Sequence, residues 1–92
     1  MMQWSFTPQA LRQLKDLPSP DQGKIVERIE WLCSQEEPLR WAKKLSGVPG
    51  KVYRFEAWPY RVIFDWEGAS ILVLLVGNRK DVYPRLRRLL RL

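Results

Sequence analysis

Three arginines and one tyrosine occupy positions from which they could act together on a phosphate-containing ligand. Arg54 and Arg61 stand in two short segments that alternate like strands, and Arg79 and Tyr83 follow an apolar segment. Arginine binds phosphate oxygens through paired N–H groups and stays charged at working pH. Tyrosine stacks on bases or exchanges a proton. Ordinary roles stay open here, because both strand arginines can face solvent and Tyr83 can anchor the C-terminal segment.

The segments that carry these residues predict a three-stranded meander. Alternation with a period of two predicts strands over residues 52–57, 60–66 and 70–76, joined by turns short enough for hairpins. The third segment is apolar on both faces, which predicts a central strand that is covered on both sides.

The geometry of strands brings the candidate residues toward one place. Successive side chains of a strand point to opposite faces, so Arg54 shares its face with Glu56. The hairpin turn places Arg61 on the neighbouring strand, and Arg79 and Tyr83 follow the end of the third strand. We expect the three arginines and the tyrosine to converge on one end of the sheet.

The N-terminal part predicts one strand and two helices. Residues 2–6 alternate between apolar and polar side chains, the period of a half-buried strand. Thr7 followed by Pro8 predicts the N-cap and first position of a helix with leucines along one face, which Pro18 ends. Ser19, with a glutamine three residues later, predicts a capping box at the start of a second helix with an apolar stripe.

The remaining segments complete the predicted fold. Residues 39–51 are less regular and predict a helical turn or two followed by a loop, and Pro84 predicts the start of a short final helix. The expected fold is α+β, with a small antiparallel sheet made of the N-terminal strand and the meander, two N-terminal helices packed on it and a short C-terminal helix. Residues 1–92 are expected to form a single domain.

The charge of the chain is unevenly distributed. Residues 1–37 carry four Lys or Arg and six Asp or Glu, a net charge of −2, whereas residues 38–92 carry twelve and four, a net charge of +8. Such asymmetry favours a nucleic acid or an acidic protein as partner. A basic face that is simply solvated is the alternative.

Several classes of function are excluded or disfavoured. The chain has no histidine and one cysteine, Cys33, so it lacks an internal disulfide and the usual zinc ligands, and Cys33 is expected in the core. It has no P-loop, dinucleotide-binding turn or G-x-S-x-G motif, and its carboxylates show no metal-ligand spacing, so no cofactor or metal is expected. No signal peptide is visible, and the longest apolar run, residues 71–76, is too short to span a bilayer. We therefore expect a soluble cytoplasmic protein that does not associate with membranes.

Five short motifs give the chain a resemblance to a known family. They are Lys44-Leu45-Ser46-Gly47, Tyr53-Arg54, Tyr60-Arg61-Val62-Ile63-Phe64, Val76-Gly77-Asn78-Arg79 and Val82-Tyr83. Together, in this order and spacing, they resemble the RelE/ParE toxin superfamily, whose pattern is a K-L-x-G loop, a Y-R or Y-K strand, a Y-R strand, an apolar strand ending in V-G-x-R and a tyrosine. The resemblance spans nearly the whole chain.

The resemblance implies the toxin of a type II toxin–antitoxin pair, held by a cognate acidic antitoxin. RelE-like members cleave mRNA on the ribosome without a metal, through attack of the ribose 2′-OH on the adjacent phosphate, and leave a cyclic phosphate and a 5′-OH. ParE-like members share the fold but poison DNA gyrase. The sequence favours the endoribonuclease, with ribosome and mRNA as partners, and leaves open a gyrase inhibitor or an inactive homologue that only binds an antitoxin.

The resemblance also implies roles for particular residues. Arg61 and Arg79 match arginines that neutralise the phosphorane, and Arg79 is further expected to assist protonation of the leaving group. Arg54 matches a basic strand residue, and Tyr83 matches a tyrosine that stacks on or orients a base. The four form the expected catalytic set, and the expected RNA-binding lysines are Lys43, Lys44, Lys51 and Lys80.

Two positions depart from the family pattern. Glu56 stands where RelE proper has a second strand lysine, and Asn78 stands where many relatives have histidine. Arginine is a poor base because its pKa lies above ~12. The sequence therefore does not identify a general base.

Overall fold

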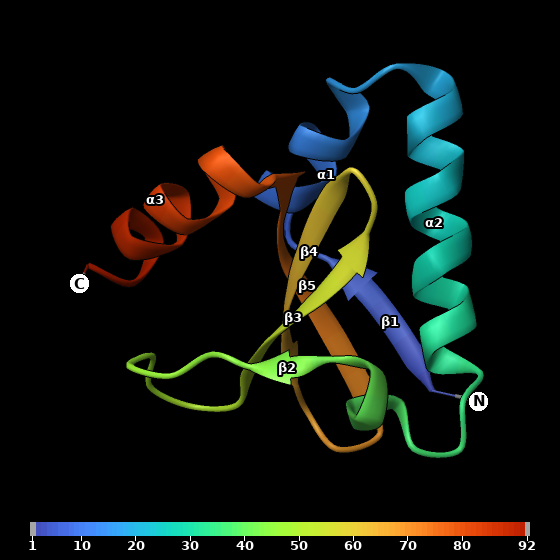
Figure 1. Cartoon of the computed structure of the whole chain (residues 1–92), viewed down its shortest axis with the longest axis vertical. Coiled ribbons are helices and arrows are strands. Elements are labelled where there is room, and N and C mark those ends of the chain that lie inside the picture. The colour runs from blue at the N-terminus through green and yellow to red at the C-terminus, as the bar shows by residue number, and fades with distance from the viewer. Residues whose placement is uncertain (1, 92) are drawn as a thin grey trace.

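The computed structural model describes residues 2–91, in which a mixed sheet lies between helices (Figure 1). The strands are β1 (Gln3–Phe6), β2 (Lys43–Lys44), β3 (Val52–Ala57), β4 (Tyr60–Trp66) and β5 (Ser70–Asn78), and the helices are α1 (Pro8–Lys15), α2 (Ser19–Cys33), the 3₁₀ helix η1 (Pro38–Trp41) and α3 (Arg79–Leu90). The predicted α+β class is confirmed, and the three strands of the meander begin where the alternation placed them. Within residues 2–91, none of the helices is both long enough and apolar enough to traverse a bilayer.

The order of strands in the sheet is β1-β5-β4-β3-β2. The pairs of the meander are antiparallel, but β1 pairs with β5 in parallel, so the sheet is mixed rather than antiparallel throughout. Strand β5 is an interior strand, whereas the centre of the sheet is β4, because β2 adds a fifth strand at the edge. The two residues of β2 are too few to show a period, which is why the sequence did not predict this strand.

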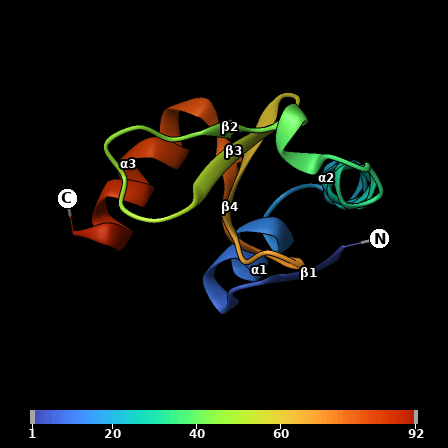
Figure 2. The ribbon, with the colours of Figure 1, turned by 90° about the horizontal axis from the view of Figure 1, so that it is seen from below.

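The two faces of the sheet are covered by different helices (Figure 2). On one face the larger core joins α1 and α2 to the sheet, through residues such as Leu14, Ile29 and Phe64, and Cys33 lies within it as expected. On the other face a smaller core joins Val82 and Leu86 of α3 to the sheet. Helix α3 thus covers the face opposite to α1 and α2, so β5 is covered on both sides, as its apolar sequence predicted.

The start of α2 differs from the prediction. Pro18, not Ser19, occupies its N-cap position, and no side chain caps the helix there. The amide of Gln22, predicted to complete a capping box, instead donates to the carbonyls of Leu17 and Lys15, at 2.7 and 3.2 Å. Gln22 thus closes the end of the preceding helix, where carbonyls lack partners within the helix.

Helix α3 begins five residues earlier than predicted. The side chain of Asn78 accepts a hydrogen bond from the backbone N–H of Asp81 (3.0 Å), so Asn78 is the N-cap and Pro84 lies inside the helix. The helix can follow β5 at once because Gly77 has no side chain: a Cβ there would lie 3.3 Å from Cγ2 of Val82. Tyr83 is therefore a helical residue.

Thr7 confirms the predicted cap of α1. Its hydroxyl accepts from the backbone N–H of Ala10 at 3.1 Å and lies 3.5 Å from the carbonyl oxygen of Leu74 on β5. Replacing Thr7 with alanine should lower the free energy of unfolding by about 1 kcal/mol, because the N–H of Ala10 loses its partner. Thr7→Ser keeps the hydroxyl and serves as the control. Urea denaturation that gives the same midpoint for Thr7→Ala and the unmodified chain would contradict this role.

Candidate functional site

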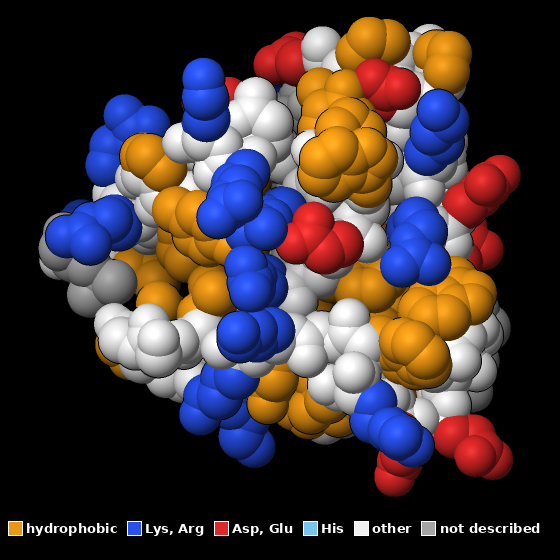
Figure 3. All heavy atoms as spheres, in the orientation of Figure 1, with side chains coloured by type: hydrophobic (Ala, Val, Ile, Leu, Met, Phe, Trp, Pro, Cys, Tyr) orange, Lys and Arg blue, Asp and Glu red, His pale blue; other side chains and the backbone are white. Residues whose placement is uncertain are grey.

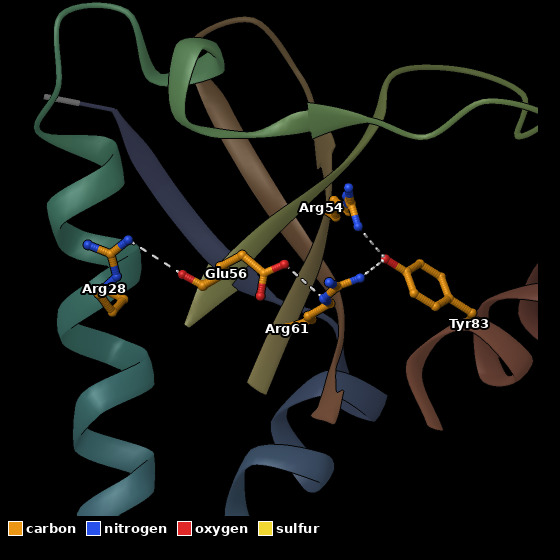
Figure 4. Close-up of polar contacts among 5 residues, drawn as sticks. All are labelled: Arg28, Arg54, Glu56, Arg61 and Tyr83. Carbon is orange, nitrogen blue, oxygen red and sulfur yellow. Dashed lines mark hydrogen bonds and ion pairs between the residues drawn. The ribbon is translucent and has the colours of Figure 1, made fainter. Parts of the chain in front are cut away.

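Three of the four predicted catalytic residues meet on the face of the sheet that α3 covers (Figure 4). Nη1 of Arg54, on β3, donates to the hydroxyl oxygen of Tyr83 at 3.2 Å. Nη1 of Arg61, on β4, donates to the same oxygen, and its guanidinium carbon lies 5.6 Å from the centroid of the tyrosine ring. Elements far apart in the sequence thus bring two cations to one hydroxyl group.

This arrangement fixes how the hydroxyl of Tyr83 can be used. Its oxygen accepts from both guanidinium groups, so its own hydrogen remains available to a ligand. Each guanidinium has five N–H donors and spends few of them here. The cluster can therefore present several hydrogen-bond donors to one anion.

Glu56 joins the cluster through an ion pair that the sequence did not predict. Its Oε1 lies 2.8 Å from Nε of Arg61, directly across the β3–β4 pair. The side chain of Arg61 is only 12% exposed, whereas that of Glu56 is 51% exposed, so the carboxylate stands at the opening of the cluster. With Arg54, Arg61 and Glu56 together, the net charge is +1. The sequence pattern did place Glu56 on the same face as Arg54, but it does not specify the side-chain rotamer that lets Glu56 pair with Arg61.

Arg28 of α2 is a second residue that sequence reasoning missed. Its Nη2 lies 3.4 Å from the backbone oxygen of Glu56. Its guanidinium carbon lies 4.6 Å from the ring centroid of Trp31 and 4.8 Å from that of Phe55. Nothing in the pattern of the helix distinguished this arginine from a solvated one.

The structure does not join Arg79 to the cluster. It is the exposed first residue of α3, and within residues 2–91 no hydrogen bond or ion pair links it to Arg54, Arg61 or Tyr83. Its role stays a prediction.

The four predicted lysines are all exposed, but they do not share one face. Lys43 lies opposite Arg54 across the β2–β3 pair and shares its face, whereas Lys44 lies opposite Tyr53 and points to the other face. Lys51 immediately precedes β3, and Lys80 lies in the first turn of α3. Figure 3 shows basic side chains in a column from β2 toward the start of α3. RNA binding by these lysines stays a prediction.

Two other titratable groups near the sheet are less suited to chemistry. The hydroxyl of Tyr60 donates to the carboxylate of Asp21, and this hydrogen bond, with desolvation and the charge of Asp21, raises the pKa of Tyr60. Burial, with a contribution from Glu30, raises the pKa of Cys33. Both groups therefore stay protonated at neutral pH. Among residues 2–91, no group of three or more His, Cys, Asp and Glu is placed to hold a metal ion.

Glu56 should weaken the binding of anions at the cluster. A second negative charge 4–5 Å away costs about 1 kcal/mol in water-like surroundings. We therefore expect Glu56→Gln to bind inorganic phosphate about fivefold more tightly, measured by NMR titration at low ionic strength. Glu27→Gln removes another exposed carboxylate that does not pair with Arg61 and is the control. Equal affinities for Glu56→Gln and the unmodified chain would show that the anion does not use Arg61.

Comparisons with known proteins found a family model and solved structures that are similar to this chain. The family model described as "ParE toxin of type II toxin-antitoxin system, parDE" matches residues 5–83. No match was found among curated proteins.

Solved structures of two kinds are similar. The toxin–antitoxin complex RelBE2 from Mycobacterium tuberculosis contains a chain with 26% identity and a TM-score of 0.75, over 85% of this chain and 98% of that one. A chain of the chromosomal ParDE system from P. aeruginosa is 27% identical with a TM-score of 0.61, over 85% of this chain and 96% of that one. The isolated E. coli RelE toxin is 23% identical with a TM-score of 0.63, over 98% of this chain and 100% of that one. This similarity concerns the fold alone.

Proposed function

Because the chain belongs to the ParE toxin family of type II toxin–antitoxin systems, within the RelE/ParE superfamily, we propose that its toxic activity is the metal-independent cleavage of mRNA on the ribosome. The observation that carries this proposal is the meeting of Arg54, Arg61 and Tyr83 on one face of the sheet. Two guanidinium groups and a free hydroxyl hydrogen suit a phosphate that gains negative charge during a reaction.

The proposed reaction is an in-line transfer within the RNA. The 2′-oxygen of a ribose forms a bond to the adjacent phosphorus, the bond from phosphorus to the 5′-oxygen breaks, and the products are a cyclic phosphate and a 5′-OH. Arg54 and Arg61 stabilise the charge of the phosphorane, and Tyr83 donates its hydrogen to a phosphoryl oxygen. The proton of the 2′-OH passes to Glu56, the carboxylate that contacts this cluster.

The exposed basic residues complete the proposed RNA site. In this proposal, flanking phosphates are contacted by Arg79 and Lys80, which are exposed in the first turn of α3, and by Lys43, which lies opposite Arg54. Arg79 is the candidate for protonation of the leaving 5′-oxygen. Lys44 and Lys51 add positive potential, which steers a polyanion toward the site.

A cognate acidic antitoxin is the proposed protein partner, beside the ribosome and its mRNA. The RelBE2, archaeal RelE-RelB and E. coli RelBE structures that resemble this chain are toxin–antitoxin complexes. The net charge of +8 in residues 38–92 suits an acidic segment.

A ParE-like inhibitor of DNA gyrase is the second candidate. The ion pair between Glu56 and Arg61 favours it, because the pair neutralises one of the two cations that a nuclease would direct at phosphate. The match to a family model described as ParE toxin is compatible with both activities.

Induction of the protein in cells distinguishes the two candidates. For a nuclease, new 5′ ends should accumulate within A-site codons of translated messages and should be absent from untranslated messages. Purified gyrase should supercoil DNA normally in the presence of the protein. Loss of supercoiling without new 5′ ends would overturn the nuclease proposal and support the inhibitor.

A further inference from the structure

Trp58 lies beside the cluster and is the most exposed large hydrophobic residue within residues 2–91, at 86%. It follows β3 directly, in the turn to β4, two residues after Glu56. Figure 3 shows hydrophobic side chains protruding over this turn, next to the basic column. A single exposed tryptophan is unremarkable by itself, so its surroundings decide whether it has a role.

Trp58 forms one wall of a groove of about 620 Å³ between α2 and the β3–β4 hairpin. The groove is also lined by Lys24, Glu27, Arg28, Trp31 and Glu56. Two indole rings and a guanidinium thus border one open space. Arg28 is fixed there, because it lies against the rings of Trp31 and Phe55 and contacts the backbone oxygen of Glu56.

The composition of the groove indicates its ligand. Lys24 and Arg28 balance Glu27 and Glu56, so the lining has no net charge and does not favour an acidic peptide. The exposed ring of Trp58 and the held guanidinium of Arg28 suit a flat polar ring, because both groups stack on π-systems. A nucleobase has this chemistry, and stacking accepts any base because each has a π-face.

The groove is continuous with the phosphate cluster through Glu56. The side chain of Glu56 pairs with Arg61, while its backbone oxygen contacts Arg28, so Figure 4 places Arg28 and Tyr83 on opposite sides of this residue. Trp58 lies two positions after Glu56, with Ala57 between them, a span of about 6–7 Å along an extended chain. One nucleotide bridges such a distance.

We propose that Trp58 is a stacking platform for the base of a nucleotide that adjoins the cleaved phosphate, with the groove beside Arg28 and Trp31 receiving that base. The ligand class is single-stranded RNA, and the proposal rests on the proposed function. It adds a second subsite that holds the strand by a base, whereas the cluster holds it by a phosphate.

Titration of the full chain with a short single-stranded RNA tests the platform. The RNA carries 2′-O-methyl riboses, so it binds without being cleaved. Trp58→Leu keeps apolar bulk without a π-face and should weaken binding about tenfold or more. Trp58→Phe keeps an aromatic face and should lose less than threefold. Leu11→Ala removes another exposed apolar side chain, on α1 and outside the groove, and should bind as the unmodified chain does.

Other outcomes overturn the platform in distinct ways. If Trp58→Leu binds as the unmodified chain does while Arg61→Ala binds more weakly, the platform is wrong and the phosphate site remains. If the unmodified chain shows no saturable binding, both subsites are wrong. If Trp58→Leu loses affinity for the antitoxin or gyrase but keeps it for RNA, Trp58 contacts a protein. The mapping of 5′ ends reports on cleavage separately from all three results.

Discussion

Replacing Arg61 with alanine should lower the toxicity and the rate of mRNA cleavage by at least about 100-fold. Arg61 contacts both Tyr83 and Glu56, so its loss removes a charge from the phosphate site and frees both partners to move. Loss of one preorganised donor to a charged transition state typically costs 10²–10³ in rate. Growth after induction and cleavage of a ribosome-bound message measure the effect.

The fold and the binding of the antitoxin should survive this substitution. Glu56, once unpaired, is half exposed and remains hydrated, so the loss of stability should be small. Arg40→Ala removes another arginine from an ion pair, the exposed one with Glu37, and should leave toxicity unchanged. If Arg61→Ala still kills cells at the unmodified rate, the phosphate site lies elsewhere.

Replacing Phe64 with alanine should lower the free energy of unfolding by about 3–5 kcal/mol. Phe64 is fully buried on β4 and stacks on Tyr53 with ring centroids 5.7 Å apart. It packs in the larger core against α1 and α2, so its removal leaves a cavity that these helices cannot readily fill. Domains of this size are stable by roughly 5–15 kcal/mol, so much of the total would be lost.

Urea denaturation measures this loss as a lower midpoint with an unchanged m-value. Phe64→Leu retains most of the volume and should cost less, and Leu11→Ala, at an exposed position of α1, should change stability by less than about 0.5 kcal/mol. A loss of less than about 0.5 kcal/mol in the free energy of unfolding of Phe64→Ala would show that the core closes over the gap.

The elements that the sequence predicted well are those with a regular period. The first two strands of the meander, β3 and β4, have the bounds that the sequence pattern predicted, whereas β5, which is apolar on both faces, runs two residues beyond its predicted end at residue 76. The predicted ends of helices failed where two signals competed. Proline at position 84 indicates a helix start, but Asn78 caps the helix earlier, and the smaller core holds the intervening turn in place.

The candidate site was predictable only as far as backbone geometry reaches. Neighbouring strands place Arg54 and Arg61 together whatever their rotamers, and Tyr83 reaches them because α3 packs on their face. The pairing of Glu56 with Arg61 depends on side-chain torsions and on competition between partners, which spacing does not encode. The close approach of Val82 to Gly77 likewise becomes visible only once α3 is in place beside β5.

The position of Tyr83 in the candidate site depends on the packing of α3 against the sheet. Tyr83 belongs to a helix that a small apolar cluster holds on the face opposite the main core, whereas Arg54 and Arg61 both belong to interior strands of the sheet. A segment with few buried contacts opens locally more often than the rest of a domain. In the proposed nuclease, the population competent for cleavage is then the fraction in which α3 is packed on the sheet, and the apparent activity scales with that fraction. Substitutions within α3 would therefore change the activity of the proposed nuclease while the arginines of the sheet stay in place.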